Sequence, residues 1–316
     1  MTSAIKIGVS TCLLGEKVRF DGGHKHSRYI TETLGLFFDF VPVCPETECG
    51  LGIPREAMRL VGDADRPRLV THKTRIDHTD QMLSWAAGRL DDLEKENLCG
   101  FIFKKDSPSS GLHRVKVYNE KGQAVKSGRG LFAAAFTARF PRIPVEEEGR
   151  LHDPVLRENF IEQVFALKRW RETLEKKKSM GNLVDFHTRE KLLFMAHSPK
   201  HYREMGQLVA EGKKIKPSDL YDQYEGLLIE ALSLRATVAK HTNVLMHVMG
   251  YFKKQLSGDE KQEILELIGN YRSGYLPLIV PVTLLNHFVR KYRQPYLSDQ
   301  TYLNPHPLDL QLRNHV

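Results

Sequence analysis

The sequence predicts an α/β domain with an open, mostly parallel sheet, followed by an all-α domain. Short apolar segments at residues 4–9, 40–45 and 98–104 are typical of buried strands. A helical pattern separates the second strand from the third, and this strand–helix–strand alternation favours a parallel, Rossmann-like sheet. From Leu183 onward the apolar spacing is helical throughout.

The bounds of the individual helices are inferred from residues that typically cap or end a helix. A helix after Asp77 or Thr79 places Met82 and Trp85 on one face, and a second helix over 130–141 stops at Pro141. The further helices are expected within 153–178, 188–212, 218–256, 259–274 and 280–292, with an ordered, proline-containing tail from Tyr296.

The length of 316 residues favours two domains over one. We expect an α/β domain over 1–150, a connecting helix and linker over 151–185, and a helical domain over 186–316. No apolar stretch of about 18 residues occurs, so no membrane helix is expected. The N-terminus lacks the features of a signal peptide, which makes the cytoplasm the expected compartment.

The composition also limits the kinds of partner. The formal net charge is +8, which suits binding to a polyanion such as a nucleic acid, although an ordinary basic surface explains it equally well. The sequence does not predict an oligomeric state.

Three loops rich in glycine, proline and polar residues each follow a predicted strand, at 10–26, 42–56 and 104–118. In open parallel sheets, ligands bind beyond the carboxyl ends of the strands. Cys12, Cys44 and the serine-rich segment 107–111 are therefore expected to face one crevice.

All four cysteines, Cys12, Cys44, Cys49 and Cys99, lie in the first third of the chain. A reducing compartment makes structural disulfides unlikely, so this grouping suggests metal or redox chemistry. Buried cysteines that act as small apolar residues are the alternative.

The three loops, STCLLGEKVRFDGGHKH, PVCPETECGLGIPRE and KKDSPSSGLHRVKVY, resemble the signature of the thiouracil desulfidase (TudS) family over roughly residues 4–150. The phrases FHTREKLLFMAHSPKHY, NVLMHVMGYFKK and QTYLNPHP resemble a YbgA-like domain over 186–316. The fusion resembles the RudS proteins, which remove sulfur from 4-thiouridine in tRNA.

The resemblance implies a 4Fe–4S cluster on three cysteines, with one iron left to accept the sulfur of a thiocarbonyl. Cys12 and Cys44 match the first two ligands. Glu46 matches a carboxylate that manages protons at the substrate, and Ser107 matches a serine that assists at the substrate ring.

The third ligand departs from the family, because Ser110 stands where the pattern Ser-Pro-Ser-Cys-Gly has its cysteine. A serine oxygen is a hard ligand that deprotonates with difficulty, so we expect the cluster to be lost or labile. Three explanations remain open: an engineered cysteine-to-serine change, substitution by Cys49 or Cys99, and a naturally inactive binding protein.

Arg19, Asp21, Lys104 and Lys105 are candidates for substrate binding. The alternative for Asp21 is a turn, since two glycines follow it, and the alternative for the two lysines is that they only contact water. In the second domain the histidines are expected to serve packing, capping or nucleic-acid contacts rather than metal binding.

The resulting hypothesis is a non-redox desulfidase that converts 4-thiouridine in tRNA to uridine, disabled in this chain by Ser110, with tRNA bound by the helical domain. One alternative is a desulfidase of free thiouracil or thionucleotides. The other is a catalytically inactive tRNA-binding protein.

Overall fold

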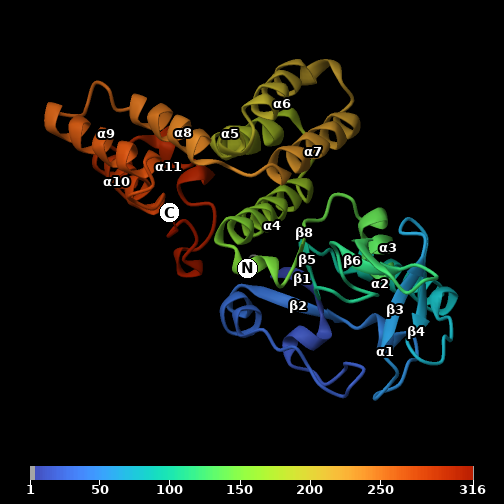
Figure 1. Ribbon diagram of the computed structural model, residues 1–316. Coiled ribbons are helices and arrows are strands. Elements are labelled where there is room, and N and C mark those ends of the chain that lie inside the picture. The colour runs from blue at the N-terminus through green and yellow to red at the C-terminus, as the bar shows by residue number, and fades with distance from the viewer. Residues whose placement is uncertain (1–3, 316) are drawn as a thin grey trace. The chain divides into compact units, whose positions relative to one another are not determined.

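The computed structural model describes residues 4–315. Contacts between Cα atoms divide the chain into two compact units, and the boundary between them follows Asp153. The first unit is α/β and the second is all-α (Figure 1), which confirms the predicted fold class. The division falls near the start of the segment 151–185 that we expected to connect the two domains.

The first sheet of the α/β domain is parallel throughout. Its order is β2 (Phe38–Val43), β1 (Ile5–Ser10), β5 (Gly100–Phe103) and β8 (Val145–Glu147). Ser10, the last residue of β1, is paired with Val43, the last residue of β2. The chain segments that follow these two strands therefore leave the sheet side by side.

A second, mixed sheet was not predicted. Its order is β4 (Pro67–Thr71), β3 (Met58–Gly62), β6 (Val115–Tyr118) and β7 (Ala124–Gly128), with β3 and β6 parallel and the outer pairs antiparallel. β6 lies inside the block 104–118, which the sequence analysis treated as loop. That block is therefore a loop only up to Arg114.

Two helices, α2 (Thr79–Lys95) and α3 (Leu131–Arg139), build the core against β5. Phe101 and Phe103 of β5 stack at 4.1 Å and meet Phe132 and Phe136 of α3. A side chain on Gly8 would place its Cβ 2.2 Å from the Phe101 ring, so β1 requires glycine at this position. Aromatic packing of this kind holds the sheet that carries the site.

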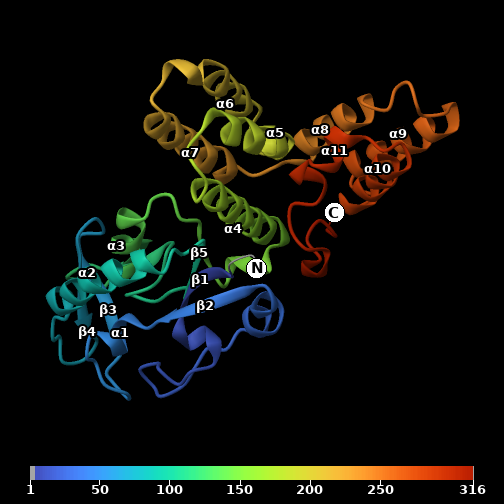
Figure 2. The same cartoon turned by 180° about the vertical axis from the view of Figure 1, so that it is seen from behind.

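The helical domain forms two groups of helices, α4–α7 and α8–α11 (Figures 1 and 2). Its helices are α4 (Pro154–Leu174), α5 (Met180–His197), α6 (Pro199–Glu211), α7 (Pro217–Ser233), α8 (Val238–Gly250), α9 (Gly258–Arg272), α10 (Ile279–Lys291) and α11 (Pro295–Ser298). None of the helices within residues 4–315 is long and apolar enough to cross a membrane.

α4 belongs to the helical domain and is not a separate connector. Its Trp170 is fully buried and lies 5.1 Å from Phe186 of α5 and 5.2 Å from Tyr224 of α7, ring centre to ring centre. The predicted break at Ser198 is confirmed, because its hydroxyl accepts the backbone N–H of His201 and caps α6.

Candidate active site

A cavity of about 340 Å³ lies where β1, β2 and β5 end. It brings together side chains from all three predicted loops. The lining residues are Ser10, Thr11, Cys12, Val18, Arg19, Phe20, Lys25, Val43, Cys44, Pro45, Glu46, Arg55, Glu56, Ala57, Met58, Lys104, Lys105, Asp106, Ser107, Pro108 and Ser110.

The two cysteines reach the cavity through short helical turns. Cys12 lies in the 3₁₀ turn Thr11–Leu14 that directly follows β1, and its carbonyl accepts the backbone N–H of Lys25 at 2.9 Å. Cys44 precedes α1 (Pro45–Glu48), and its backbone N–H donates to Glu48 at 2.7 Å. Proline at the first helical position favours this sharp change from strand to helix.

The serine-rich loop is fixed by its own backbone. The Ser107 hydroxyl accepts the N–H groups of Ser109 and Ser110, at 3.3 and 3.1 Å. A Cβ on Gly111 would lie 2.7 Å from the Ser107 carbonyl oxygen, and a Cβ on Gly130 would lie 2.5 Å from the Ser109 carbonyl. Both glycines are therefore needed for the turn that presents Ser110 to the cavity.

Glu46 connects the second loop with the third. Its Oε1 accepts hydrogen bonds from the hydroxyls of Ser109 and Ser107, the latter at 3.4 Å. Its Oε2 lies 3.6 Å from Cys44 Sγ and 3.9 Å from Arg55 Nη2. A carboxylate that touches two hydroxyls and a thiol is placed to take up and return protons in the cavity.

Burial makes the two thiols weak acids. Desolvation, with the Glu46 charge as the second cause, raises the pKa of Cys12 to about 12. The same two causes raise the pKa of Cys44. Both groups are therefore neutral thiols near pH 7 in the protein alone, and a bound cationic centre is needed to stabilise them as thiolates.

Ser110, which stands where the family pattern has its cysteine, lines the same cavity as Cys12 and Cys44. It is 3% exposed, and its hydroxyl lies 3.5 Å from that of Ser109. Two thiols and one hydroxyl do not fit a cluster held by three thiolates, because the hydroxyl is a hard ligand with a high pKa. Across residues 4–315, no group of three or more histidine, cysteine and acidic side chains is placed to hold a metal ion.

Neither remaining cysteine lines the cavity. Cys49 lies within the second loop, where its half-buried thiol donates to the Glu46 carbonyl at 3.4 Å. Cys99 is 2% exposed, and its backbone N–H donates to the carbonyl of Lys6 near the start of β1. Cys99 therefore lies at the opposite end of the sheet, as expected for a core position.

Of the predicted substrate-binding residues, Arg19, Lys104 and Lys105 line the cavity and Asp21 does not. Asp21 is exposed and accepts the N–H of Gly23 at 3.0 Å, the hydrogen bond that chiefly lowers its pKa. This geometry matches the turn that we weighed as its alternative. Lys104 Nζ donates to Glu148 at 2.6 Å, which fixes the lysine at the wall of the cavity.

The sequence analysis missed Phe20, Arg55 and Ser109. Phe20 is 40% exposed, lines the cavity, and lies 5.4 Å from the Arg19 guanidinium. Arg55 donates its backbone N–H to the Phe20 carbonyl at 2.9 Å, so it joins the first loop to the second. All three lie within the three loops, and their place in those loops was the only signal in the sequence that could have found them.

Comparison with known proteins identifies both parts of the chain. The family model described as 2-thiouracil desulfurase matches residues 7–148, and the one described as a protein of unknown function (DUF1722) matches residues 191–307. The uncharacterized protein YbgA of Escherichia coli (strain K12) is 37% identical over 153 residues, which cover 48% of this chain and 90% of YbgA. The chain joins a 2-thiouracil desulfurase domain to a DUF1722 domain of the YbgA family.

The 2-thiouracil desulfurase domain contains the whole cavity described above. It is also similar to a solved structure described as the [4Fe-4S]-dependent thiouracil desulfidase TudS, with 30% identity over 47% of this chain and 94% of that chain and a TM-score of 0.38. The family match confirms the resemblance drawn from the three loops.

Proposed function

We propose that the 2-thiouracil desulfurase domain acts on 4-thiouridine in tRNA, that the helical domain binds the tRNA, and that Ser110 leaves this chain able to bind substrate and unable to turn it over. The observation that carries the proposal is the meeting of Cys12, Cys44 and Glu46 on one cavity. Ser110 replaces the third thiol at that meeting point.

The reaction replaces sulfur by oxygen without a change in oxidation state. Water adds to the thiocarbonyl carbon, the carbon–sulfur bond breaks, and hydrogen sulfide leaves as the carbonyl forms. Glu46 is suited to remove a proton from the water and to return one to the departing sulfur. Ser107, which donates to Glu46 at 3.4 Å, is suited to hold the pyrimidine ring beside that carboxylate.

Basic and aromatic side chains around the cavity support a nucleic acid as the substrate. Lys25 and Lys105 are exposed at its rim, Arg19 is half-buried, and the exposed ring of Phe20 offers a surface on which an unstacked base can lie. These groups provide positive charge for phosphates beside the position of the base.

The helical domain offers a second set of such groups. Tyr251 and Tyr296 stack at 5.0 Å, and Lys191 Nζ lies 4.8 Å from the centre of the Tyr296 ring. Tyr251 is 37% exposed. Aromatic and cationic side chains side by side are the usual contacts of proteins with single-stranded RNA.

The test is sulfide release from tRNA that contains 4-thiouridine, after anaerobic reconstitution with iron and sulfide, for this chain and for Ser110→Cys. We expect release from the Ser110→Cys protein alone. Equal activity of the two proteins would contradict the role given to Ser110. Turnover of free 2-thiouracil, without turnover of the tRNA, would contradict the proposed substrate.

A further inference from the structure

The α/β domain contains a second cavity, of about 340 Å³, beside the cavity of the candidate active site, which we call the desulfurase cavity. It is lined by residues of β3, β6 and β7 and by part of the third loop. Met58, Asp106 and Pro108 line both cavities. The two cavities therefore adjoin within one compact unit, and a chain molecule that places one residue in the first can extend into the second.

Three cationic side chains form a row across the mixed sheet at this second cavity. Leu60 of β3 is paired with Val117 of β6. Because these strands are parallel, the residues before them, Arg59 and Lys116, also lie side by side. Lys116 is paired in turn with Lys126 of β7. Paired residues point to the same face of a sheet and neighbouring strands lie about 4.8 Å apart, so the row spans about 10 Å.

The charges of this row are not balanced by ion pairs. In the part of the chain that the structure describes, none of the three side chains forms an ion pair with a carboxylate. The Arg59 guanidinium lies 4.9 Å from the centre of the Tyr118 ring, which holds it at the cavity wall. Lys116 and Lys126 are exposed. Asp106 supplies the negative charge of the lining, so three cations stand against one carboxylate.

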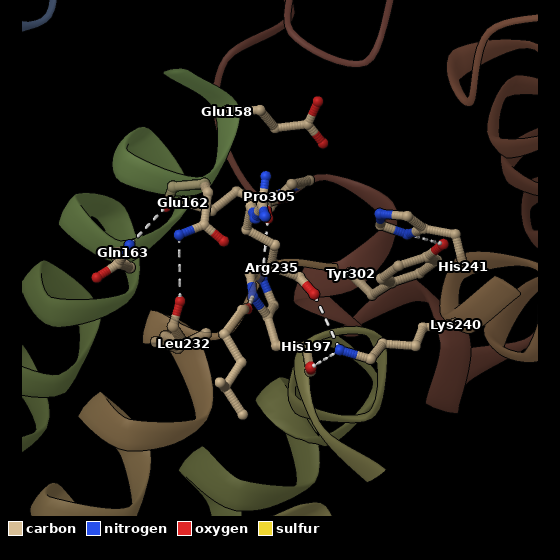
Figure 3. A network of polar contacts seen from close by, with 12 residues as sticks. Glu158, Glu162, Gln163, His197, Leu232, Arg235, Lys240, His241, Tyr302 and Pro305 are labelled. Carbon is tan, nitrogen blue, oxygen red and sulfur yellow. Dashed lines mark hydrogen bonds and ion pairs between the residues drawn. The ribbon is translucent and has the colours of Figure 1, made fainter. Parts of the chain in front are cut away.

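Such an arrangement costs stability. Like charges directly opposite each other on neighbouring strands destabilise a sheet. Several cations of the helical domain, in contrast, have acceptors within the protein. Lys240 Nζ donates to the carbonyl oxygens of His197 and Arg235 at 2.6 and 2.9 Å (Figure 3), and Arg313 Nη2 donates to the buried carboxylate of Glu162 at 2.7 Å. The row on the mixed sheet lacks such acceptors, which favours an anion from outside the chain as its partner.

We propose that this row binds the phosphates of the nucleotides that flank the target nucleotide, along the RNA strand that leaves the desulfurase cavity. The proposal rests on the RNA substrate proposed above and adds a contact surface beyond the rim of that cavity. The continuity of the two cavities favours RNA over an acidic protein segment, because a base in the first cavity brings its own flanking phosphates to the second. Arg59 is suited to a bidentate contact with one phosphate, and the two lysines supply point charges for the next.

The test compares two short, fluorescein-labelled single-stranded RNAs with 4-thiouridine at the centre. One has ordinary phosphodiester linkages, and the other has uncharged methylphosphonate linkages on both sides of the 4-thiouridine. Fluorescence anisotropy measures the binding of each RNA to the full chain over a range of salt concentrations. We expect the methylphosphonate RNA to bind about tenfold more weakly and with a smaller salt dependence.

Lys116→Gln and Lys126→Gln should each weaken binding of the phosphodiester RNA and lower the slope of log K against log salt by about 0.7. Neither variant should weaken binding of the methylphosphonate RNA further, because the phosphates that these lysines contact carry no charge there. Lys121→Gln is the matched control. Lys121 is an exposed lysine of the same β6–β7 hairpin and lines neither cavity, so its loss should change neither affinity.

An equal loss of affinity for both RNAs in the lysine variants would overturn the proposal, since it would indicate a general effect of charge. Unchanged affinity of both variants for the phosphodiester RNA would overturn it too, while the proposed RNA substrate would stand. If the unaltered chain bound neither RNA, both proposals would fail together.

Stability provides an independent readout. The urea midpoint of Lys116→Gln should equal or exceed that of the unaltered chain, because the substitution removes a like-charge contact on each side of β6. A lower midpoint would give Lys116 a role in the fold and would refute the argument from unbalanced charge.

Discussion

The hydroxyl of Ser107 accepts the backbone N–H of Ser110 at 3.1 Å. The bond fixes position 110 through its main chain, so the location of this residue at the cavity wall does not depend on its side chain. The presence of serine at position 110, where the family pattern has cysteine, therefore changes the chemistry of the site while the loop keeps its shape.

Ser110→Cys is expected to gain iron and acid-labile sulfide on anaerobic reconstitution, because it adds a thiol beside Cys12 and Cys44. Iron content and visible absorbance measure this gain against the unaltered chain. As a control, Cys99→Ser introduced together with Ser110→Cys should bind as much iron, since Cys99 lies at the far end of the sheet. A loss of iron in that control, or an equal iron content of the unaltered chain, would contradict the assignment.

Gly111→Ala should destabilise the α/β domain by about 1–3 kcal/mol, because the new Cβ would lie 2.4 Å from Val115 and 2.7 Å from a backbone oxygen. The urea midpoint, followed by Trp85 fluorescence in a Trp170→Phe background, measures the change. Gly52→Ala is the matched control in the second loop, since a Cβ there meets no atom within 4 Å. Equal midpoints for the two alanine variants would show that the serine loop tolerates the side chain.

Binding of tRNA should weaken steeply with salt if phosphates contact the rim of the desulfurase cavity. Lys25→Gln and Lys105→Gln should each lower the slope of log K against log salt by about 1. Lys121→Gln, an exposed lysine outside the cavity, should leave the slope unchanged. A flat salt response of the unaltered chain would exclude a major contribution from phosphates.

The helical domain should lose stability as the pH falls from about 7.5 to about 5. Burial lowers the pKa of His187 to about 4 and that of His241 to about 3, so the unfolded chain takes up these protons first. In full, the shift is worth roughly 3 kcal/mol for His187 and roughly 5 kcal/mol for His241, and the part below pH 6.5 is lost on acidification. Glu158, with its pKa raised, opposes this loss between about pH 7 and 4.5, but it is one group against three, because burial also lowers the pKa of His306.

Urea midpoints from Trp170 fluorescence, in a Trp85→Phe background, measure this pH dependence. His187→Gln should make the midpoint less sensitive to pH, because the glutamine does not titrate. An equal or higher midpoint at the lower pH would contradict the buried, neutral state of the two histidines.

Arg313→Met should destabilise the helical domain by about 3–5 kcal/mol, because it leaves two buried carboxylates without their guanidinium. The thermal midpoint reports the change. Adding Glu162→Gln to Arg313→Met should recover part of the loss, since it removes one of the two charges. A double variant that is less stable than Arg313→Met alone would show that Glu162 is stabilised by groups other than the arginine.

The sequence predicted those helices and strands whose buried residues form one continuous apolar run, or one apolar face, within a single segment. β1, β2, β5, α2 and α3 all lie where we expected them, because each buries a continuous apolar run or face. The second sheet was missed for a physical reason. Its strands are short, Lys116 and Lys126 interrupt their apolar pattern with exposed charges, and its pairing of β3 with β6 joins segments that are far apart in the sequence.

The same limit applies to the candidate site. Composition and strand position predicted the three loops, and with them Cys12 and Cys44. The place of Arg55 depends on its hydrogen bond to Phe20, and that of Ser109 on its hydrogen bond to Glu46. Such contacts form between loops, so no local pattern in either loop indicates them.

The pairing of Arg313 with Glu162 joins two residues that are 151 positions apart. During synthesis, α4 leaves the ribosome long before the arginine that neutralises its buried carboxylates. The parallel sheet of the α/β domain, in contrast, has its last strand once Glu147 has emerged. The desulfurase domain is therefore able to fold while the ribosome is still translating the helical domain. The first helix of the helical domain, α4, becomes fully packed only after the C-terminal residues that complete its core have been synthesised.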